Sequence, residues 1–510
     1  MKHMRVDRLI AEQALSRAAG APLVAGNDLR LLRNASENYP AWLAAIASAR
    51  HSIMFETYIW TDDRVGRQFA EALAERARAG VKVRVLHDWL GAGPWEGRKL
   101  WKLMKDAGCE VRCFNKPRLD RPSNWLARDH RKMIAVDGAI GFVSGLCVSA
   151  EWAGRPEHGI DEWRDSGVVL RGPAIADIEQ AFVQTWTAAG GAIEPDELTD
   201  PASIAPAGDM GVRVVAASPS HPGVYALDQL VSSIASRTLW VADAYFVALP
   251  LYVQALRAAA EDGVDVRLLV PGSSDVPVLR PVTRAGYRPL LKSGVRVFEW
   301  NGPMMHAKTA VADGRWGRVG STNLNIASWM GNWELDVAVE HEGFAHTLEE
   351  QYERDLENAT EIVLSPRRRV KRVAPPRPRA LRQRLHPHAT GARAAAGALR
   401  FMNTMGGIVS RPRELRNAEP TTFVAFGVCL IMIAMAMVIW PMLVAVPASV
   451  ISIWLGLTLM ISGVRRLRQR RRRQAEAAAA GPEAATAAAP PPATSPPRLT
   501  PGREPVKFQA

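Results

Sequence analysis

The first 365 residues of the chain contain an internal repeat, and no other feature constrains the fold as much. Three pairs of segments correspond in order: residues 46–60 with 234–247, 69–89 with 252–270, and 107–115 with 293–301. The first pair predicts the end of a helix and then a buried strand. The second pair predicts a helix, a glycine in its C-terminal turn and an apolar strand, and the third predicts a short strand after a glycine.

This alternation of β and α elements predicts an α/β fold in each half. We expect a mixed, mostly parallel sheet flanked by helices in each half, and a pseudo-twofold relation between the halves. At 510 residues the chain is too long for one core. The expected divisions are an N-terminal helix in residues 1–30, a first half in 31–205 and a second half in 206–365. Any site that the halves share is expected where they meet.

Residues 421–464 predict a membrane helical hairpin. Residues 422–440 carry no charge and are long enough to cross a bilayer, and residues 449–464 form a second uncharged stretch after Pro441 and Pro447. Arginines flank both outer ends, which places both ends in the cytoplasm. We therefore expect the first 365 residues to lie on the cytoplasmic side of the inner cell membrane. The alternative is a buried helical hairpin of a soluble domain.

The positive charge of the chain is confined to its C-terminal third. Residues 366–420 carry 14 Lys/Arg and 2 Asp/Glu, and residues 421–510 carry 10 and 3, so of the net charge of +13 the other 365 residues hold −6. A nucleic-acid surface on the globular part is not expected. The basic, Pro-rich linker at 366–420 is instead predicted to meet anionic lipid, and the basic stretch after 465 passes into a low-complexity, disordered tail.

The four cysteines are Cys109, Cys113, Cys147 and Cys429, and none belongs to a CxxC or Cys/His cluster. This usage indicates a reducing compartment without a disulfide framework or a zinc site.

The repeat ends in two matching motifs, HRKMIAVD at 130–137 and HAKTAVAD at 306–313. In a strand, a period of two sends His130 and Lys132 to one face, and the same holds for His306 and Lys308. Each motif ends in an aspartate followed by glycine, Asp137 in the first half and Asp313 in the second. A DG pair predicts a turn, so we interpret these aspartates as braces for a hairpin within the motif, away from the substrate.

Two histidines and two lysines at one site suit phosphodiester chemistry. A pair of lysines can clamp the phosphate oxygens. One neutral histidine can attack phosphorus, and the other can protonate the leaving alcohol and later deprotonate the incoming one. No metal or other cofactor is expected, because the lysines supply positive charge. A single histidine of this kind would ordinarily be a hydrogen-bonded core residue, whereas the duplicated set favours a catalytic site.

The duplicated HxKxxxxD resembles the hallmark of the phospholipase D superfamily over about residues 30–360. The resemblance implies that His130 is the nucleophile and His306 the general acid and base. It implies phosphate contacts from Ser321 and Asn323 in the second half and from Ser144 in the first. In the first half, SGLC has Cys147 where the family usually has asparagine.

The resemblance also implies a role for two acidic residues. Asp165 in EWRDSGVVLRG and Glu334 in NWELDVAVE match family acids that orient the histidine of the opposite half.

Within the superfamily, IMFETYIW, AGVKVRVL, DHRKMIAVDG and WRDSGVVLRGPA are similar to bacterial cardiolipin synthases. The implied reaction transfers a phosphatidyl group from one phospholipid to phosphatidylglycerol through a phosphohistidine. The alternatives are a phospholipase D that uses water as acceptor, a nuclease of the superfamily, and a non-catalytic scaffold that binds lipid through the basic linker.

Overall fold

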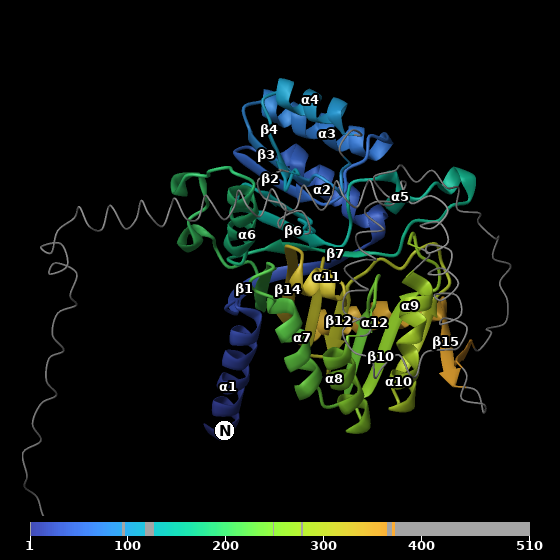
Figure 1. Ribbon diagram of the computed structural model, residues 1–510. Coiled ribbons are helices and arrows are strands. Elements are labelled where there is room, and N and C mark those ends of the chain that lie inside the picture. Colours follow the sequence, from blue (N-terminus) through green and yellow to red (C-terminus); the bar gives the residue numbers. More distant parts are fainter. Residues whose placement is uncertain are drawn as a thin grey trace, which may run out of the picture. The chain divides into compact units, whose positions relative to one another are not determined.

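The computed structural model describes residues 2–93, 97–117, 127–247, 249–276, 279–364 and 370–372. Within these residues the strands form one 16-stranded sheet, in the order β16-β15-β11-β10-β9-β12-β13-β14-β8-β1-β7-β6-β5-β2-β3-β4 (Figure 1). The two halves meet at its centre, where β1 pairs with β8. Read outward from this pair, the halves have the same order of strands, which gives the predicted pseudo-twofold relation.

The strands of the first half are β1 (Val24–Arg33), β2 (Ser52–Thr57), β3 (Lys82–Asp88), β4 (Glu110–Phe114), β5 (Met133–Val136), β6 (Ile140–Ser144) and β7 (Ser166–Arg171). Their counterparts in the second half are β8 (Met210–Ala217), β9 (Thr238–Ala242), β10 (Asp265–Pro271), β11 (Arg296–Trp300), β12 (Thr309–Ala312), β13 (Trp316–Gly320) and β14 (Glu334–Glu340). Two further strands, β15 (Ala359–Leu364) and β16 (Val370–Arg372), extend the edge of the second half.

The sheet is mixed, and the expectation that it is mostly parallel is wrong. Only β2, β3 and β4, and likewise β9, β10 and β11, run parallel to one another. The strands from β5 to β7, and from β12 to β14, are antiparallel. The physical reason is the connection: helical crossovers join the parallel strands, whereas a short turn can join only antiparallel ones.

Helices cover both faces of the sheet. One face packs on α6 (Ile175–Ala188) and α12 (Glu342–Glu357), and its apolar core is continuous across the two halves. The other face carries α2 (Asn34–Ser48), α3 (Arg64–Arg78) and α5 (Ala150–Ala153) in the first half. In the second half it carries α7 (Gly223–Ile234), α8 (Pro250–Glu261), α10 (Tyr287–Lys292) and α11 (Ile326–Met330). The remaining helices are α4 (Arg98–Asp106) and α9 (Leu279–Ala285). Short 3-10 turns lie at Pro156–His158, Pro195–Glu197 and Pro201–Ser203.

The repeated helix–glycine–strand pattern has a direct structural cause. In α3 the residues Val65, Phe69 and Leu73 recur at helical spacing and are buried, while Asp63 caps the helix by accepting from the Gly66 N–H. Gly80 then ends the helix with a φ of +89°, a conformation that costs glycine no steric strain. The helix therefore stops at the residue that lets the chain turn into β3.

The predicted N-terminal helix is α1 (Lys2–Ala19), and it belongs structurally to the second half. Figure 1 shows α1, in blue, beside α7, in green, and the two helices are in contact. Leu15 and Ala19 are buried in the same cluster as Leu227 and Val231 of α7.

Among the described residues, no helix is both long enough and apolar enough to cross a membrane. The predicted hairpin at 421–464 and the tail at 465–510 lie outside the described residues, as does all of the basic linker at 366–420 except β16.

Candidate active site

The two histidine–lysine pairs lie just before strands of the central sheet. The sequence predicted them inside the strands, but β5 begins at Met133 and β12 at Thr309, so His130 and Lys132, like His306 and Lys308, occupy the extended segments that precede them. All four side chains are nevertheless buried. Each pair lies at the end of its strand that is nearer to the other half.

Backbone contacts between the halves set the position of each histidine. The His130 N–H donates to the carbonyl oxygen of Trp333 at 2.9 Å, and the His306 N–H donates to that of Arg164 at 2.6 Å. Trp333 and Arg164 are the residues immediately before the acids Glu334 and Asp165. Each histidine is thus held next to the acid of the opposite half by the main chain itself.

The histidine side chains contact those same acids. His130 Nδ1 lies 2.8 Å from Glu334 Oε2, and His306 Nδ1 lies 2.6 Å from Asp165 Oδ2. Because an ionised carboxylate only accepts, Nδ1 carries the proton in both rings and the lone pair is left on Nε2. Each acid thus lies beside the histidine of the opposite half, and Nε2 of each ring is left as the atom with a free lone pair.

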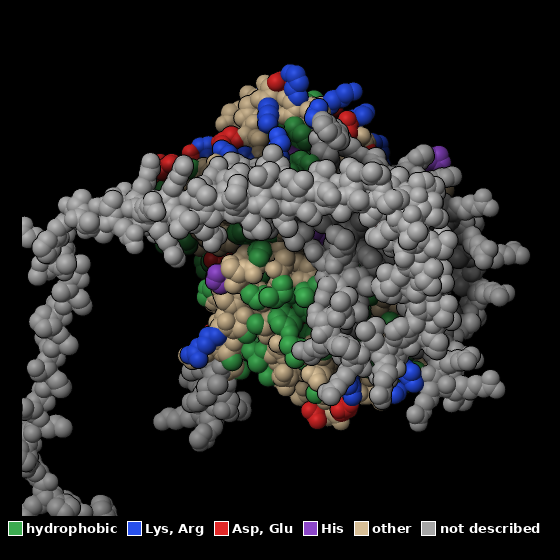
Figure 2. Space-filling view, in the orientation of Figure 1, with side chains coloured by type: hydrophobic (Ala, Val, Ile, Leu, Met, Phe, Trp, Pro, Cys, Tyr) green, Lys and Arg blue, Asp and Glu red, His purple; other side chains and the backbone are tan. Residues whose placement is uncertain are grey.

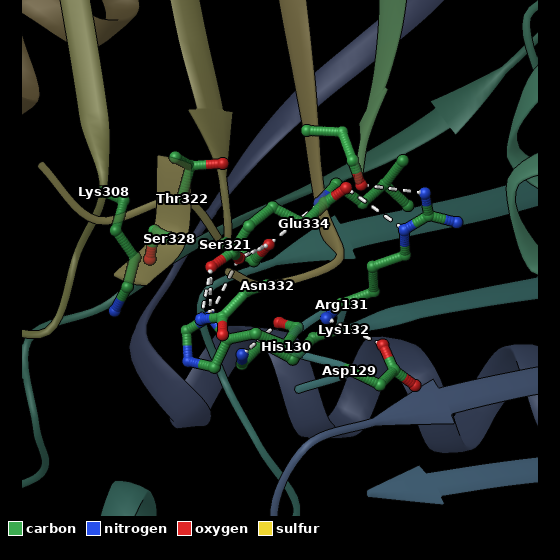
Figure 3. A network of polar contacts seen from close by, with 12 residues as sticks. Asp129, His130, Arg131, Lys132, Lys308, Ser321, Thr322, Ser328, Asn332 and Glu334 are labelled. Carbon is green, nitrogen blue, oxygen red and sulfur yellow. Dashed lines mark hydrogen bonds and ion pairs between the residues drawn. The ribbon is translucent and has the colours of Figure 1, made fainter. Parts of the chain in front are cut away.

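Further donors fix the carboxylate of Glu334. Ser321 Oγ donates to Oε2 at 2.6 Å, and Asn332 Nδ2 donates to Oε1 at 3.2 Å, as Figure 3 shows. Burial opposes ionisation of Glu334, but His130 and Lys132 outweigh it and hold the pKa below its ordinary value. Ser321, predicted to hold phosphate, therefore orients the acid in this structure.

A different set of donors fixes Asp165. Trp152 Nε1 donates to Oδ2 at 2.9 Å, and the Ser166 N–H donates to Oδ1 at 2.8 Å. Burial raises the pKa of the Asp165 carboxyl, but the nearby His306 and Lys308 lower it by more. The pKa of Asp165 therefore lies below its ordinary value. Both acids are therefore anions beside their histidines.

Burial lowers the pKa of His130 to about 3 and that of His306 to about 4. Glu334 and Asp165 counteract part of this effect, while the nearby lysines add to it. Burial also lowers the pKa of Lys308, to about 8, and lowers that of Lys132. At neutral pH the site thus holds two neutral imidazoles and a cationic Lys308.

Each lysine folds back over its own histidine. Lys132 Nζ donates to the His130 carbonyl oxygen and Lys308 Nζ to that of His306. Lys308 Nζ also lies 3.1 Å from His306 Nε2. The two ammonium groups are close enough for Lys132 to lower the pKa of Lys308. An anionic group between the halves would be attracted to both.

The structure adds two tyrosines that we did not single out from the sequence. The Tyr58 ring lies edge-on to His130, with centroids 5.0 Å apart, and Lys132 Nζ is 5.4 Å from its centre. Tyr245 has the same relation to His306, at 5.8 Å, and to Lys308 Nζ, at 5.9 Å. The signal was available, because ETYIW and DAYFV occupy corresponding places in the internal repeat.

The polar residues after each motif differ between the halves. The Ser144 N–H donates to the Lys132 carbonyl and the Gly320 N–H to that of Lys308, so these two positions correspond. Gly145 therefore stands where the second half has Ser321, and Ser144 Oγ donates to the Leu146 carbonyl at 3.4 Å.

The next polar position also differs. Cys147 corresponds to Asn323, and both side chains are buried. Asn323 Oδ1 has no hydrogen-bond partner among the described residues. The second half therefore offers more polar groups to a phosphate than the first.

The motif aspartates lie at the far ends of β5 and β12. Asp137 accepts from the backbone N–H groups of Arg50, His51 and Ser52, each at 2.8 Å, and its own φ is +53°. Asp313 accepts in the same way from residues 236–238, with a φ of +55°. With Gly138 and Gly314 also at positive φ, both DG turns have the geometry that closes two-residue hairpins. In this structure both aspartates brace hairpins and do not contact the histidines.

No group of three or more His, Cys, Asp or Glu side chains in the described ranges is arranged to hold a metal ion. What the site does bring together is two imidazoles, two lysines and two carboxylates, and each histidine contacts the acid of the other half. This combination suits covalent transfer of a phosphoryl group.

Two α/β halves that share one histidine–lysine site in this way form an enzyme of the phospholipase D type. Residues 42–186 and 230–356 match the family described as cardiolipin synthase, PLD-like domain. The chain belongs to this family, which confirms the family predicted from the sequence.

Individual relatives agree. A cardiolipin synthase of Geobacillus kaustophilus is 32% identical over 353 residues, which cover 67% of this chain and 68% of that protein. Cardiolipin synthase A of Pseudomonas entomophila is 28% identical over 377 residues, or 72% and 76% of the two chains.

A solved structure shares the fold. The phosphatidylserine synthase of Haemophilus influenzae Rd KW20 superposes with a TM-score of 0.55 over 69% of this chain and 91% of that one, at 14% identity.

Proposed function

We propose that this protein is a cardiolipin synthase that transfers a phosphatidyl group from a phospholipid to phosphatidylglycerol. The observation that carries the proposal is the pair of buried histidines, each hydrogen-bonded through Nδ1 to an acid of the opposite half. The similar proteins named as cardiolipin synthases support the choice of phospholipid substrates.

In the first step, His130 Nε2 attacks phosphorus of the donor lipid. The bond from phosphorus to the departing alcohol breaks, and His306 gives the Nε2 proton of its imidazolium to that oxygen. Since burial lowers the pKa of His306 to about 4, protonation must accompany binding of the anionic phosphodiester, which favours a positive imidazole beside it. The product is a phosphatidyl group bonded to His130.

In the second step, the hydroxyl of phosphatidylglycerol gives its proton to His306 Nε2 and its oxygen attacks phosphorus. The nitrogen–phosphorus bond breaks, cardiolipin forms and His130 is restored. Glu334 and Asp165 stabilise the imidazolium forms of the two rings throughout. Lys132, Lys308, Ser321 and Asn323 are proposed to hold the non-bridging oxygens.

Exposed apolar residues of the second half suit a substrate that lies in a membrane. Leu251 of α8 and Met330 of α11 are 57% and 53% exposed, and hydrophobic side chains gather over α7 and its neighbours in Figure 2. Tyr252 and Trp329, the residues adjacent to these two, are in ring contact at 5.2 Å, so α8 and α11 pack against each other here. We propose that this surface meets the bilayer.

The remaining parts of the chain are assigned by proposal as well. The catalytic halves at 31–205 and 206–365 would lie on the cytoplasmic face of the inner membrane. The linker at 366–420 would bind anionic lipid, and residues 421–464 would form the membrane hairpin.

Incubation of the full chain with vesicles of labelled phosphatidylglycerol tests the proposal. We expect labelled cardiolipin and released glycerol, and no cardiolipin from His130→Ala or His306→Ala protein that folds normally. An acid-labile lipid adduct should be found on His130 when the unsubstituted protein is denatured during turnover, and not in His130→Ala protein. Formation of phosphatidic acid without cardiolipin would establish hydrolysis instead, and full activity of either variant would refute the two-histidine mechanism.

A further inference from the structure

The strand registers relate the two halves residue by residue. Arg30 of β1 lies opposite the fourth residue after Asp165, and Arg213 of β8 lies opposite the fourth residue after Glu334. Since Asp165 and Glu334 are equivalent acids, Arg30 and Arg213 are equivalent arginines. Both point to the face of the sheet that carries α2 in the first half and α7 in the second.

In the second half, α1 covers this position. Arg213 is fully buried, donates to the Glu12 carbonyl at 3.2 Å and to Ser16 Oγ at 3.3 Å, and forms an ion pair with Glu340. Leu15 of α1 packs on the apolar side chains of α7 and β8. The groove between α7 and the sheet is therefore filled by a helix, and its arginine is neutralised by an acid of the next strand.

In the first half, the equivalent groove is a pocket of about 640 Å³. Arg30 is exposed there. The residue equivalent to Glu340 is Arg171, which also lines the pocket and is exposed. Neither arginine forms an ion pair or a side-chain hydrogen bond with any described residue. The second half thus has an ion pair between Arg213 and Glu340, whereas the first half has two arginines without an ion pair at the equivalent positions.

The lining of this pocket combines the two cations with an apolar floor. The apolar residues come from α2 and from four neighbouring strands, and include Ala41, Ala45, Val136, Ile140, Phe142 and Val169. In an antiparallel pair, Arg30 and Arg171 occupy diagonal positions about 7–8 Å apart, a separation that two guanidinium groups bridge through one phosphate.

Two carboxylates also line the pocket. The Asp137 carboxylate accepts hydrogen bonds from three backbone N–H groups. Asp28, beside the arginines, is therefore the carboxylate that can interact with a molecule in the groove. The two arginines and Asp28 leave one net positive charge on β1 and β7, where the phosphodiester would lie, while the negative charge of Asp137 follows β5, two strands away from β7.

We propose that this groove is a second lipid site, which binds an anionic phospholipid with its phosphate between Arg30 and Arg171 and an acyl chain along the apolar floor. The site lies apart from the catalytic centre, because Val136 and Asp137 line it at one end of β5 while His130 precedes the other end. This inference rests on the proposed function only in the identity of the lipid. A bound helix would reproduce the role of α1, but the change from Glu340 to Arg171 favours an anionic occupant.

Photo-crosslinking of the full chain tests the proposal. The probe is phosphatidylglycerol with a photoactivatable acyl chain in phosphatidylcholine vesicles, and adducts are mapped to peptides by mass spectrometry. We expect adducts on α2 or β6 in addition to those at the catalytic centre. The double variant Arg30→Glu/Arg171→Glu should lower the groove adducts by about tenfold or more while the catalytic adducts persist.

Two further variants separate charge from space. Ala44→Trp, at an exposed position of α2 that lines the pocket, should also remove the groove adducts. The control Arg78→Glu/Lys99→Glu makes the same change of charge at exposed positions of α3 and α4 and should leave the adducts in place. Inorganic phosphate should not compete with the anionic probe for the groove. A zwitterionic probe of the same chain length should not label the groove.

Several outcomes would overturn the proposal. Equal labelling by the zwitterionic probe, or groove adducts that survive both the charge reversal and Ala44→Trp, would exclude an anionic lipid site. A lipid-free protein in which Ala44→Cys resists maleimide would show that a polypeptide covers the groove. Cardiolipin formation is measured in the same samples, so loss of turnover with intact groove adducts would count against the proposed function alone.

Discussion

His130 Nδ1 lies 2.8 Å from Glu334 Oε2, although 204 positions separate the two residues along the chain. The reciprocal pair, His306 and Asp165, is 141 positions apart. Each of these histidines is therefore oriented by the half of the molecule that does not contain it. Neither half can form a complete site alone, which explains why the motif occurs twice in one chain.

Replacing Glu334 with glutamine should lower kcat by roughly 10²-fold or more, because the neutral amide no longer stabilises a positive charge on His130. Asp165→Asn should act in the same way on His306. Labelled cardiolipin formation measures both. Glu361→Gln, which removes an exposed acid paired with Arg296, is the matched control and should be silent. Wild-type kcat in Glu334→Gln would show that the contact is only structural.

The activity should fall in alkaline solution. Burial lowers the pKa of Lys308 to about 8, so the ammonium is present below that pH and is lost above it. As the charge disappears, kcat/KM should decline about tenfold for each pH unit above 8. Arginine stays protonated throughout this range, so Lys308→Arg should keep a flat alkaline limb even if its absolute rate is lower. An unchanged limb in that variant would assign the ionisation to another group.

The local elements could be predicted because their signals are local. Helix periodicity ending at Gly80, strand composition and the DG turns depend on neighbouring residues, and the duplicated pattern doubled each signal. The mostly parallel sheet was wrong because the hairpin from β5 to β6 and its equivalent add antiparallel strands that the helix–strand alternation does not reveal. The start of β5 at Met133 was also missed, because contacts with the opposite half hold the preceding residues instead.

The cross-half contacts depend on tertiary structure, and no periodicity in the sequence encodes them. The pairing of His130 with Glu334 was implied only by family resemblance, and the contact of Tyr58 with His130 was not predicted. The groove beside Arg30 becomes visible only when strand registers equate it with Arg213.

An amide at position 147 should improve the first half of the site. Burial raises the pKa of the Cys147 thiol, which therefore stays neutral and is a weak donor. Cys147→Asn would place there the amide that Asn323 supplies in the second half. One added hydrogen bond to phosphate should raise kcat/KM roughly two- to tenfold. Cys147→Ala controls for loss of the thiol, and a lower rate in Cys147→Asn than in Cys147→Ala would contradict the symmetric role.

The rings of Tyr58 and Tyr245 should matter more than their hydroxyl groups to the two lysine–histidine pairs. An aromatic face near an ammonium stabilises its charged form. Tyr58→Phe should therefore retain most activity, whereas Tyr58→Leu should lower kcat and lower the pH at which Lys132 loses its proton. Profiles of kcat/KM against pH for both variants measure this. Identical profiles for the leucine and phenylalanine proteins would restrict Tyr58 to packing.

Asp137→Asn should lower stability without a comparable loss of chemistry. The Asp137 carboxylate accepts from three backbone N–H groups, whereas an asparagine side chain has a single acceptor oxygen, so we expect the free energy of unfolding to fall by about 1–3 kcal/mol. Asparagine tolerates the positive φ of this turn, so the substitution tests the hydrogen bonds and adds no backbone strain. Denaturant unfolding of the full chain gives the stability, and kcat per folded molecule gives the chemistry. Asp313→Asn should repeat the result in the second half. If either variant lost activity at unchanged stability, the motif aspartate would have a catalytic role that its position far from the histidines does not explain.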